Sequence, residues 1–216
     1  MKKNQNVLAG ILLLVGFAVW TFLIQEVDVQ PIGPNGSSVG FAALNGWFHQ
    51  LTGVHWMLYT LTDWLGLVPI FVCLIFAGIG FVQLVQRKSL FKVDLDIIML
   101  GAYYVLVIFG YLLFEMVPIN YRPVLIEGYL EASYPSSTTL LVLSVMPTLY
   151  FQAQRRLTAN ALRQAIRIFS VLFSAFMVIG RLVSGVHWLT DIMGAVLLSS
   201  GMFQIYKVCV NLLCKE

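Results

Sequence analysis

The chain has 216 residues, of which 59% are hydrophobic and 11% are charged, and its formal net charge is +3. Soluble globular domains carry about 25% charged residues, so this composition excludes a soluble domain and indicates a membrane protein. We therefore expect a lipid bilayer around the chain and no nucleic-acid partner.

Six apolar runs follow one another along the chain, and a helix needs about 20 residues to cross a hydrocarbon core about 30 Å thick. Backbone polar groups in lipid must be satisfied within their own segment, so these runs are predicted to be helices. The fold class is therefore all-α, one domain of residues 1–216 with six transmembrane helices. In chain order they are Val7–Ile24, Leu65–Leu84, Ile97–Phe114, the short Thr139–Gln152, Ile168–Val186 and Leu189–Val208.

The basic residues predict the orientation, because basic residues near helix ends are retained on the cytoplasmic side. Most of them fall on the side of the N-terminus: Lys2, Lys3, Arg87, Lys88, Lys92, Arg155, Arg156, Arg163, Arg167, Lys207 and Lys215. Both termini are thus expected to be cytoplasmic, in a plasma membrane that is bacterial by the small size and short loops. Arg122 and Arg181 are expected on the opposite side, where they require an anionic ligand or pairing with Glu115, Glu127 or Glu131.

The first outer loop, from Gln25 to Trp64, begins with turn residues around Pro34. The stretch that follows, through Trp47 and Trp56, has the character of an amphipathic interfacial segment. We expect it to form a rim or lid over the outer surface.

The segment Gly180–Asp191 carries the strongest chemical signal. His187 and Asp191 are spaced i, i+4, which places the carboxylate one turn from the imidazole on the same helix face. There it can accept the proton of one ring nitrogen and leave the other exposed as a nucleophile. A short turn brings Arg181 back toward His187, and the three groups together suit phosphoryl chemistry. Each also has a structural explanation, as an interfacial anchor, a helix cap and a snorkelling arginine.

Two further segments point to an anion site. Ser136 and Ser137 stand where the outer loop turns into the fourth helix, and free N–H groups with the helix dipole bind anions there. Helix capping explains these serines equally well. Arg122, held by Pro123, adds a second cation on the same loop.

These segments, in this order, resemble the type-2 phosphatidic acid phosphatase superfamily of membrane lipid phosphatases. The resemblance covers Glu115 to Gly194. The family signature is Lys, six residues, Arg-Pro; then Pro-Ser-Gly-His; then Ser-Arg, five residues, His, three residues, Asp. The matching positions are Arg122, Pro123, Pro135, Ser136, Arg181, His187 and Asp191.

The resemblance implies that His187 attacks the phosphorus to form a phosphohistidine, which water then hydrolyses, and that Asp191 orients the histidine. The phosphate oxygens would be held by Arg122, Arg181, Ser136 and the Ser137 amide. It also implies chemistry without a metal or other cofactor. The three cysteines have no metal-ligand or disulfide spacing.

Three positions depart from the signature. Glu115 stands where lysine is expected, Thr138 where histidine is expected, and Gly180 where serine is expected. The missing histidine is the family's proton donor to the leaving oxygen, a role worth about 10²–10⁴-fold. Glu115 replaces a phosphate-binding cation with an anion.

Two hypotheses follow. In the first, the chain is a phosphatase or phosphotransferase for a lipid phosphate or pyrophosphate, with a leaving group that needs little protonation or with a neutral Glu115 as the acid. In the second, it is catalytically impaired and binds a lipid phosphate headgroup for sensing, transport or assembly. The intact pair of His187 and Asp191 favours the enzyme. Transmembrane charges along a pathway are scarce, which disfavours a plain transporter. Neither the lipid nor the oligomeric state is predicted.

Overall fold

A computed structural model describes residues 2–214, with side chains from Gln5 onward. Within that range the regular structure is helical, which confirms the all-α prediction. The long helices are α1 (Lys2–Glu26), α4 (Leu67–Arg87), α5 (Leu95–Met116), α6 (Ser137–Arg156), α7 (Asn160–Val183) and α8 (Leu189–Leu213). The short ones are α2 (Ala42–Thr52), α3 (Trp56–Leu65) and the 3-10 turns η1 (Pro34–Gly36) and η2 (Leu90–Lys92). The six long helices correspond to the six predicted runs.

Five segments are long and apolar enough to cross a membrane. They are Gln5–Glu26, Trp56–Arg87, Leu95–Met116, Asn160–Val183 and Leu189–Leu213. Large apolar side chains of these segments are exposed on the outside of the bundle, Phe71 and Phe109 among them. Exposed apolar surface of this kind suits contact with lipid.

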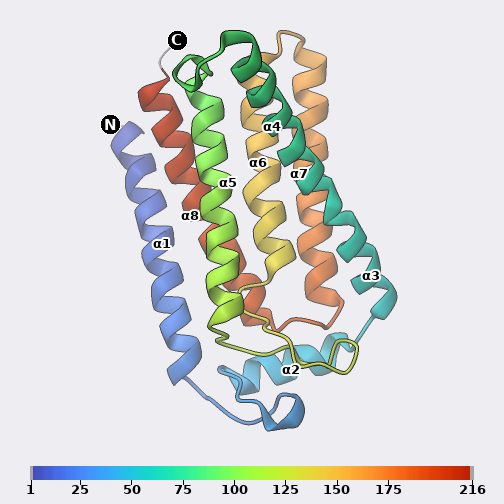
Figure 1. Ribbon diagram of the computed structural model, residues 1–216. Helices are drawn as coiled ribbons and strands as arrows, with labels where there is room; N and C mark the ends of the chain where they lie inside the picture. The colour runs from blue at the N-terminus through green and yellow to red at the C-terminus, as the bar shows by residue number, and fades with distance from the viewer. Residues whose placement is uncertain (1, 215–216) are drawn as a thin grey trace.

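The predicted fourth helix, α6, is the least apolar of the long helices. It contacts α4, α5, α7 and α8 and lies in the middle of the bundle (Figure 1). Its Thr148 hydroxyl lies 2.7 Å from the Tyr104 hydroxyl, and Gln152 Nε2 donates to the Tyr206 hydroxyl at 2.9 Å. Because protein surrounds this helix, buried polar side chains with partners are tolerated in it. This central position explains why its apolar run is short.

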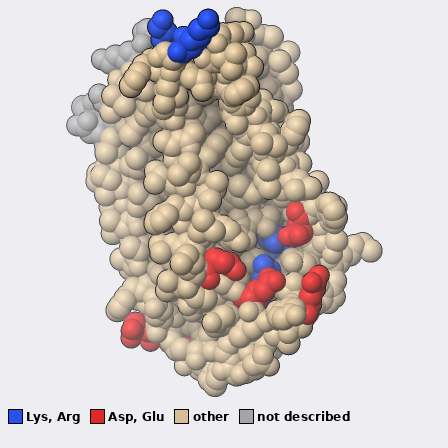
Figure 2. All heavy atoms as spheres, in the orientation of Figure 1, with Lys and Arg blue, Asp and Glu red and all other residues tan. Residues whose placement is uncertain are grey.

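The two ends of the bundle differ in charge. The start of α1 and the end of α8 lie at one end of the bundle, together with the α4–α5 and α6–α7 connections (Figure 1). There Arg87 pairs with Asp94 at 2.6 Å, and Arg156 pairs with Asp94 at 3.3 Å and Asp96 at 2.7 Å. At the opposite end, Figure 2 shows two small basic patches among carboxylates.

Two short helices cover that opposite end, where the sequence predicted an interfacial segment. α2 lies across the ends of the long helices (Figure 1). Its buried Asn45 donates to the Gly40 carbonyl at 2.8 Å and to Thr190 Oγ1 at 3.0 Å. α3 contacts α7 and leads directly into α4. Trp47 and Trp56 are 60% and 50% exposed, as is usual for tryptophan at a membrane surface.

Gly185 lies in the turn between α7 and α8 with a φ of +71°. A β-carbon there would lie 1.9 Å from the Gly53 carbonyl oxygen. We expect Gly185→Ala to lower the unfolding temperature in detergent, because a left-handed backbone costs other residues about 1–3 kcal/mol and the clash with Gly53 adds to that cost. Gly36→Ala is the matched control, since Gly36 has a φ of +73° and open space around it. Equal shifts in both variants would show that the Gly53 contact contributes nothing.

Candidate phosphate site

Four segments meet at the end of the bundle that α2 covers: α3, the α5–α6 loop, the first turn of α6 and the α7–α8 turn. Backbone and side-chain hydrogen bonds join them. His55 N donates to the Ser184 carbonyl at 2.9 Å, and Ser136 N donates to the Asp191 carbonyl at 3.2 Å. Trp188 Nε1 donates to the Tyr121 carbonyl at 2.7 Å. The predicted site residues are therefore brought to one place by tertiary contacts.

His187 is 3% exposed and reaches Asp191 through a serine. Its Nδ1 lies 3.0 Å from Ser133 Oγ, and Ser133 Oγ donates to Asp191 Oδ2 at 2.5 Å. Since the single hydroxyl proton is used toward Asp191, Nδ1 must be the donor to Ser133, which leaves Nε2 unprotonated. The sequence predicted a direct hydrogen bond from the His187 ring to Asp191, and this prediction is wrong. His187 Nδ1 and Asp191 Oδ2 are 3.9 Å apart. Sequence reasoning missed Ser133.

Asp191 is fully buried and has further donors. The Trp188 N–H donates to its Oδ2 at 2.8 Å, and Asn120 Nδ2 donates to its Oδ1 at 3.4 Å. The same carboxylate therefore caps the first turn of α8 and accepts the bond from Ser133. Asp191 can therefore act both as a helix cap and as the residue that positions His187.

His187 lines a polar cavity of about 220 Å³. Its Nε2 has no hydrogen-bond partner. Burial, followed by the nearby charges of Arg122 and Arg181, holds the pKa of His187 well below its usual 6.5. A neutral imidazole with a free lone pair is the form that acts as a nucleophile. Other residues that line this cavity are Tyr111, Phe114, Glu115, Arg122, Glu131, Ser133, Tyr134 and Ser137.

Both predicted arginines are buried and lie against the ring of Tyr59 from α3. Their Cζ atoms are 5.9 Å (Arg122) and 4.9 Å (Arg181) from the ring centre. Arg122 Nε lies 3.0 Å from Glu131 Oε2, and its Nη1 has no partner. Arg181 Nη2 lies 3.2 Å from Asp63 Oδ1. Each arginine thus has an acidic neighbour. Glu131 was among the expected partners, whereas Asp63 and Tyr59 were missed.

The first turn of α6 presents Ser137 to the cavity. Ser136 is placed differently from the expectation, since it is fully buried and its hydroxyl donates to Thr139 Oγ1 at 3.0 Å. Its hydroxyl is therefore engaged inside α6 and does not face the cavity. Thr138 Oγ1 accepts a bond from Arg181 Nη2 at 2.7 Å.

Two of the departures from the signature have a visible structural setting. Glu115 is exposed and lines the polar cavity beside Arg122. Gly180 lies against α3, where a β-carbon would be 2.7 Å from Thr62 Cγ2. The close approach of α3 to α7 therefore occupies the space that a serine side chain would need.

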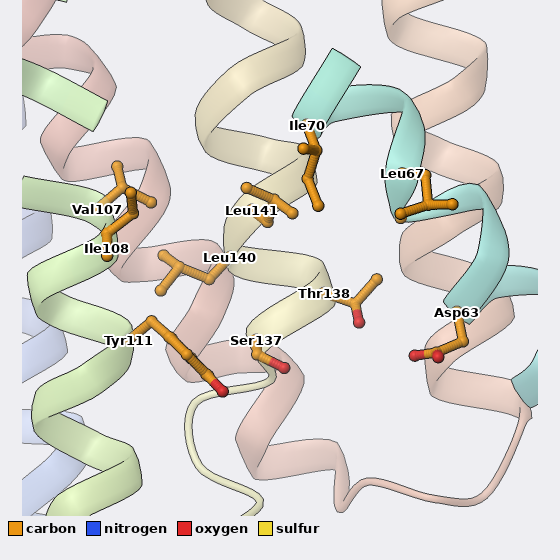
Figure 3. Close-up of a pocket in the computed structure, with 11 residues that line it drawn as sticks. Asp63, Leu67, Ile70, Val107, Ile108, Tyr111, Ser137, Thr138, Leu140 and Leu141 are labelled. Carbon is orange, nitrogen blue, oxygen red and sulfur yellow. The ribbon is translucent and has the colours of Figure 1, made fainter. Parts of the chain in front are cut away.

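A second, apolar cavity of about 250 Å³ adjoins the polar one. Its apolar walls are Leu67, Ile70, Val107, Ile108, Leu140 and Leu141, and Figure 3 shows the polar side chains Asp63, Ser137, Thr138 and Tyr111 below them in the view. Tyr111 and Ser137 line both cavities. A ligand with a polar head and an apolar tail would fit across the pair.

The PAP2 superfamily model matches residues 99–213, which is more than half of the chain. The chain belongs to the PAP2 superfamily. The matched range extends from α5 to the end of α8 and includes each of the predicted site residues. The resemblance seen in the sequence is thereby confirmed. A comparison with curated proteins finds no significant match.

The fold also has a likeness among solved structures. It is similar to the crystal structure of a transmembrane PAP2-type phosphatidylglycerolphosphate phosphatase from Bacillus subtilis, with a TM-score of 0.65 and 16% sequence identity. The match covers 94% of this chain and 96% of that one. It therefore includes α1 to α4, which the family match does not reach.

Proposed function

We propose that this member of the PAP2 superfamily is a membrane phosphatase or phosphotransferase that acts on a lipid phosphate or pyrophosphate through a phosphohistidine at His187. The observation that carries the proposal is the state of the His187 ring. Nδ1 is oriented through Ser133 to Asp191, and the buried Nε2 is left without a partner. A site that only binds phosphate needs the arginines but has no use for an oriented, neutral imidazole.

In the proposed first step, the Nε2 lone pair forms a bond to phosphorus, and the bond to the leaving oxygen breaks with its electron pair on that oxygen. Arg122 Nη1 and the free N–H groups of the first turn of α6 stabilise the charge on the other phosphate oxygens. The chain through Ser133 to Asp191 stabilises the charge that develops on the imidazole. Water then attacks the phosphorus, the N–P bond breaks with its electron pair returning to Nε2, and the water's proton leaves to solvent with the phosphate product. An alcohol in the place of water would make the reaction a phosphotransfer.

The threonine at position 138 favours a substrate whose leaving group needs no proton. A threonine hydroxyl is not an acid, so an alkoxide leaving group would depart without help. A lipid pyrophosphate avoids this problem because its leaving group is a phosphate. The apolar cavity beside Thr138 offers room for the first part of the lipid chain (Figure 3). By the distribution of basic residues, the site would face outward from a plasma membrane, with cytoplasmic termini.

The test is phosphate release by the purified chain from a polyprenyl pyrophosphate and from a phosphatidic acid, with His187→Ala as the control. We expect faster release from the pyrophosphate, and none above background in the variant. Retained binding of both lipids without release from either would instead support the headgroup-binding alternative.

Ser133→Ala is expected to lower kcat about 10–100-fold with little change in KM, because the ring loses the partner that orients it while Arg122, which binds the phosphate, is unchanged. Ser144→Ala is the control, since Ser144 is also a buried serine but lies within α6, whereas Ser133 lies in the loop before it. A change in KM alone would contradict the orienting role of Ser133.

The lowered pKa of His187 predicts the pH range in which acid abolishes activity. A base with a lowered pKa keeps its lone pair until the pH falls through the lowered value, so kcat/KM should persist as the pH passes below 6.5. The measurement is a pH profile of kcat/KM. An acid limb that begins at or above 6.5 would be inconsistent with a buried, neutral His187.

A further inference from the structure

The polar cavity contains more carboxylates than cations. Glu115 and Glu131 line it together with Arg122, and burial lowers the pKa of His187, which favours its uncharged form. Arg181 lies close by but is paired with Asp63. Figure 2 shows the same imbalance on the surface, where carboxylates surround the two basic patches. A simple lipid phosphate would therefore enter a site that already carries excess negative charge.

Two buried groups in this cavity are nonetheless available to an anionic ligand. His187 is 3% exposed and Arg122 is 7% exposed, and His187 Nε2 and Arg122 Nη1 both lack partners. Because both residues line the polar cavity, they mark the position of the phosphate. Glu131 is satisfied by its pairing with Arg122. Glu115 takes part in none of the ion pairs found among residues 5–214 and lies exposed at the same cavity.

Aromatic rings complete the surroundings of Glu115. Tyr111, Phe114 and Tyr134 line the same cavity, and Tyr111 and Phe114 precede Glu115 on α5. A carboxylate in the same cavity as aromatic rings is a setting that favours an organic ammonium group, through charge pairing and contact of its CH and NH groups with the rings. A divalent cation would gain nothing from the rings. Among the described residues, no group of three or more His, Cys, Asp or Glu side chains is placed to hold one.

We propose that the site accepts lipid phosphates that carry a protonated amine within a few bonds of the phosphate, with the phosphate at His187 and Arg122 and the ammonium at Glu115. This inference rests on the proposed function and adds a second substrate class for the same site, beside the lipid pyrophosphates. It gives one explanation for two departures from the family signature, the glutamate at 115 and the threonine at 138.

The ammonium would supply the proton that Thr138 cannot. As Nε2 bonds to phosphorus and the ester P–O bond breaks, the leaving oxygen takes a proton from the neighbouring ammonium of the same molecule. The lipid departs as a neutral amino alcohol, which regains a proton from water. Hydrolysis of the phosphohistidine then follows as before, so atoms and charge balance without another acid.

The experiment compares a long-chain 2-aminoalkyl phosphate with the alkyl phosphate of the same chain that lacks the amine, using the full chain in detergent. We expect kcat/KM to be about tenfold or more higher for the amino lipid, the size of effect that a charged hydrogen bond gives. Glu115→Gln should remove most of this preference, and Glu115→Lys should reverse it. Glu127→Gln is the control, because Glu127 is exposed on the α5–α6 loop and is not among the residues that line the cavity.

Three results would overturn the inference while leaving the proposed function intact, provided that release still depends on His187. In the first, kcat/KM is equal for the two lipids. In the second, both Glu115 variants keep the preference for the amino lipid. In the third, release requires Mg²⁺ and Glu115→Gln abolishes that requirement. Absence of His187-dependent release from these lipids and from the pyrophosphate would overturn the proposed function itself.

Discussion

Replacing His187 with alanine is expected to lower phosphate release by about 10⁴-fold or more, because the variant loses the atom that bonds to phosphorus. The fold should tolerate the change, since Nε2 has no partner to lose and Ser133, the partner of Nδ1, keeps its bond to Asp191. The measurement is kcat for the best lipid substrate, together with the melting temperature in detergent. His55→Ala is the matched control, because His55 is an exposed histidine at the same end of the bundle.

A modest loss in His187→Ala, of about tenfold or less, would contradict this role. Such a loss would mean that water attacks the bound phosphate directly and that the histidine only assists. An equal loss in His55→Ala would point instead to damage of the outer surface.

Thr138→His is expected to raise the rate with a phosphatidic acid by about 10²-fold, because it adds a general acid for the alkoxide leaving group. The rate with a polyprenyl pyrophosphate should change little, since a phosphate leaves without protonation. The side chain lines the apolar cavity and follows Ser137, which lines both cavities (Figure 3), so the larger ring has open space to enter. The substitution removes the 2.7 Å bond from Arg181, which slightly weakens phosphate binding in both reactions.

Thr138→Gln is the control for this gain, because glutamine adds bulk and hydrogen-bonding groups without a titratable proton. A gain in Thr138→His that Thr138→Gln does not share would assign the missing acid to position 138. Equal rates in the two variants with phosphatidic acid, with the pyrophosphate rate retained, would show that the acid is supplied elsewhere in the site.

The long helices could be predicted because their signal is local. An apolar run of sufficient length identifies a membrane helix regardless of its neighbours, and this holds for α1, α4, α5, α7 and α8. The apolar run predicted for α6 was the shortest, because contacts with other helices allow polar side chains in this helix. The buried Gln152, for example, is stabilised by its bond to Tyr206 and by a bond from Arg156. α2 and α3 were foreseen as an interfacial stretch, although their ends and their close packing against Thr190 and Gly180 were not.

The same difference between local signals and contacts of distant residues explains which parts of the site could be predicted. His187, Asp191 and Arg181 belong to one short segment, so their spacing was visible in the sequence. Ser133 is 54 positions from His187, and Asp63 is 118 positions from Arg181, so no periodicity connects either pair. Tertiary folding alone brings them together. The serine between His187 and Asp191 is the main consequence, since it changes a pair of residues into a chain of three.

The most direct test of the account is to trap the covalent intermediate. The purified chain is mixed with a polyprenyl pyrophosphate labelled in its terminal phosphate, quenched with alkali within one turnover, and digested for mass spectrometry. The account predicts label on the peptide that contains His187, stable in alkali and released by acid, and absent from His187→Ala. Steady phosphate release by the native chain with no label on His187 at any time point would contradict it.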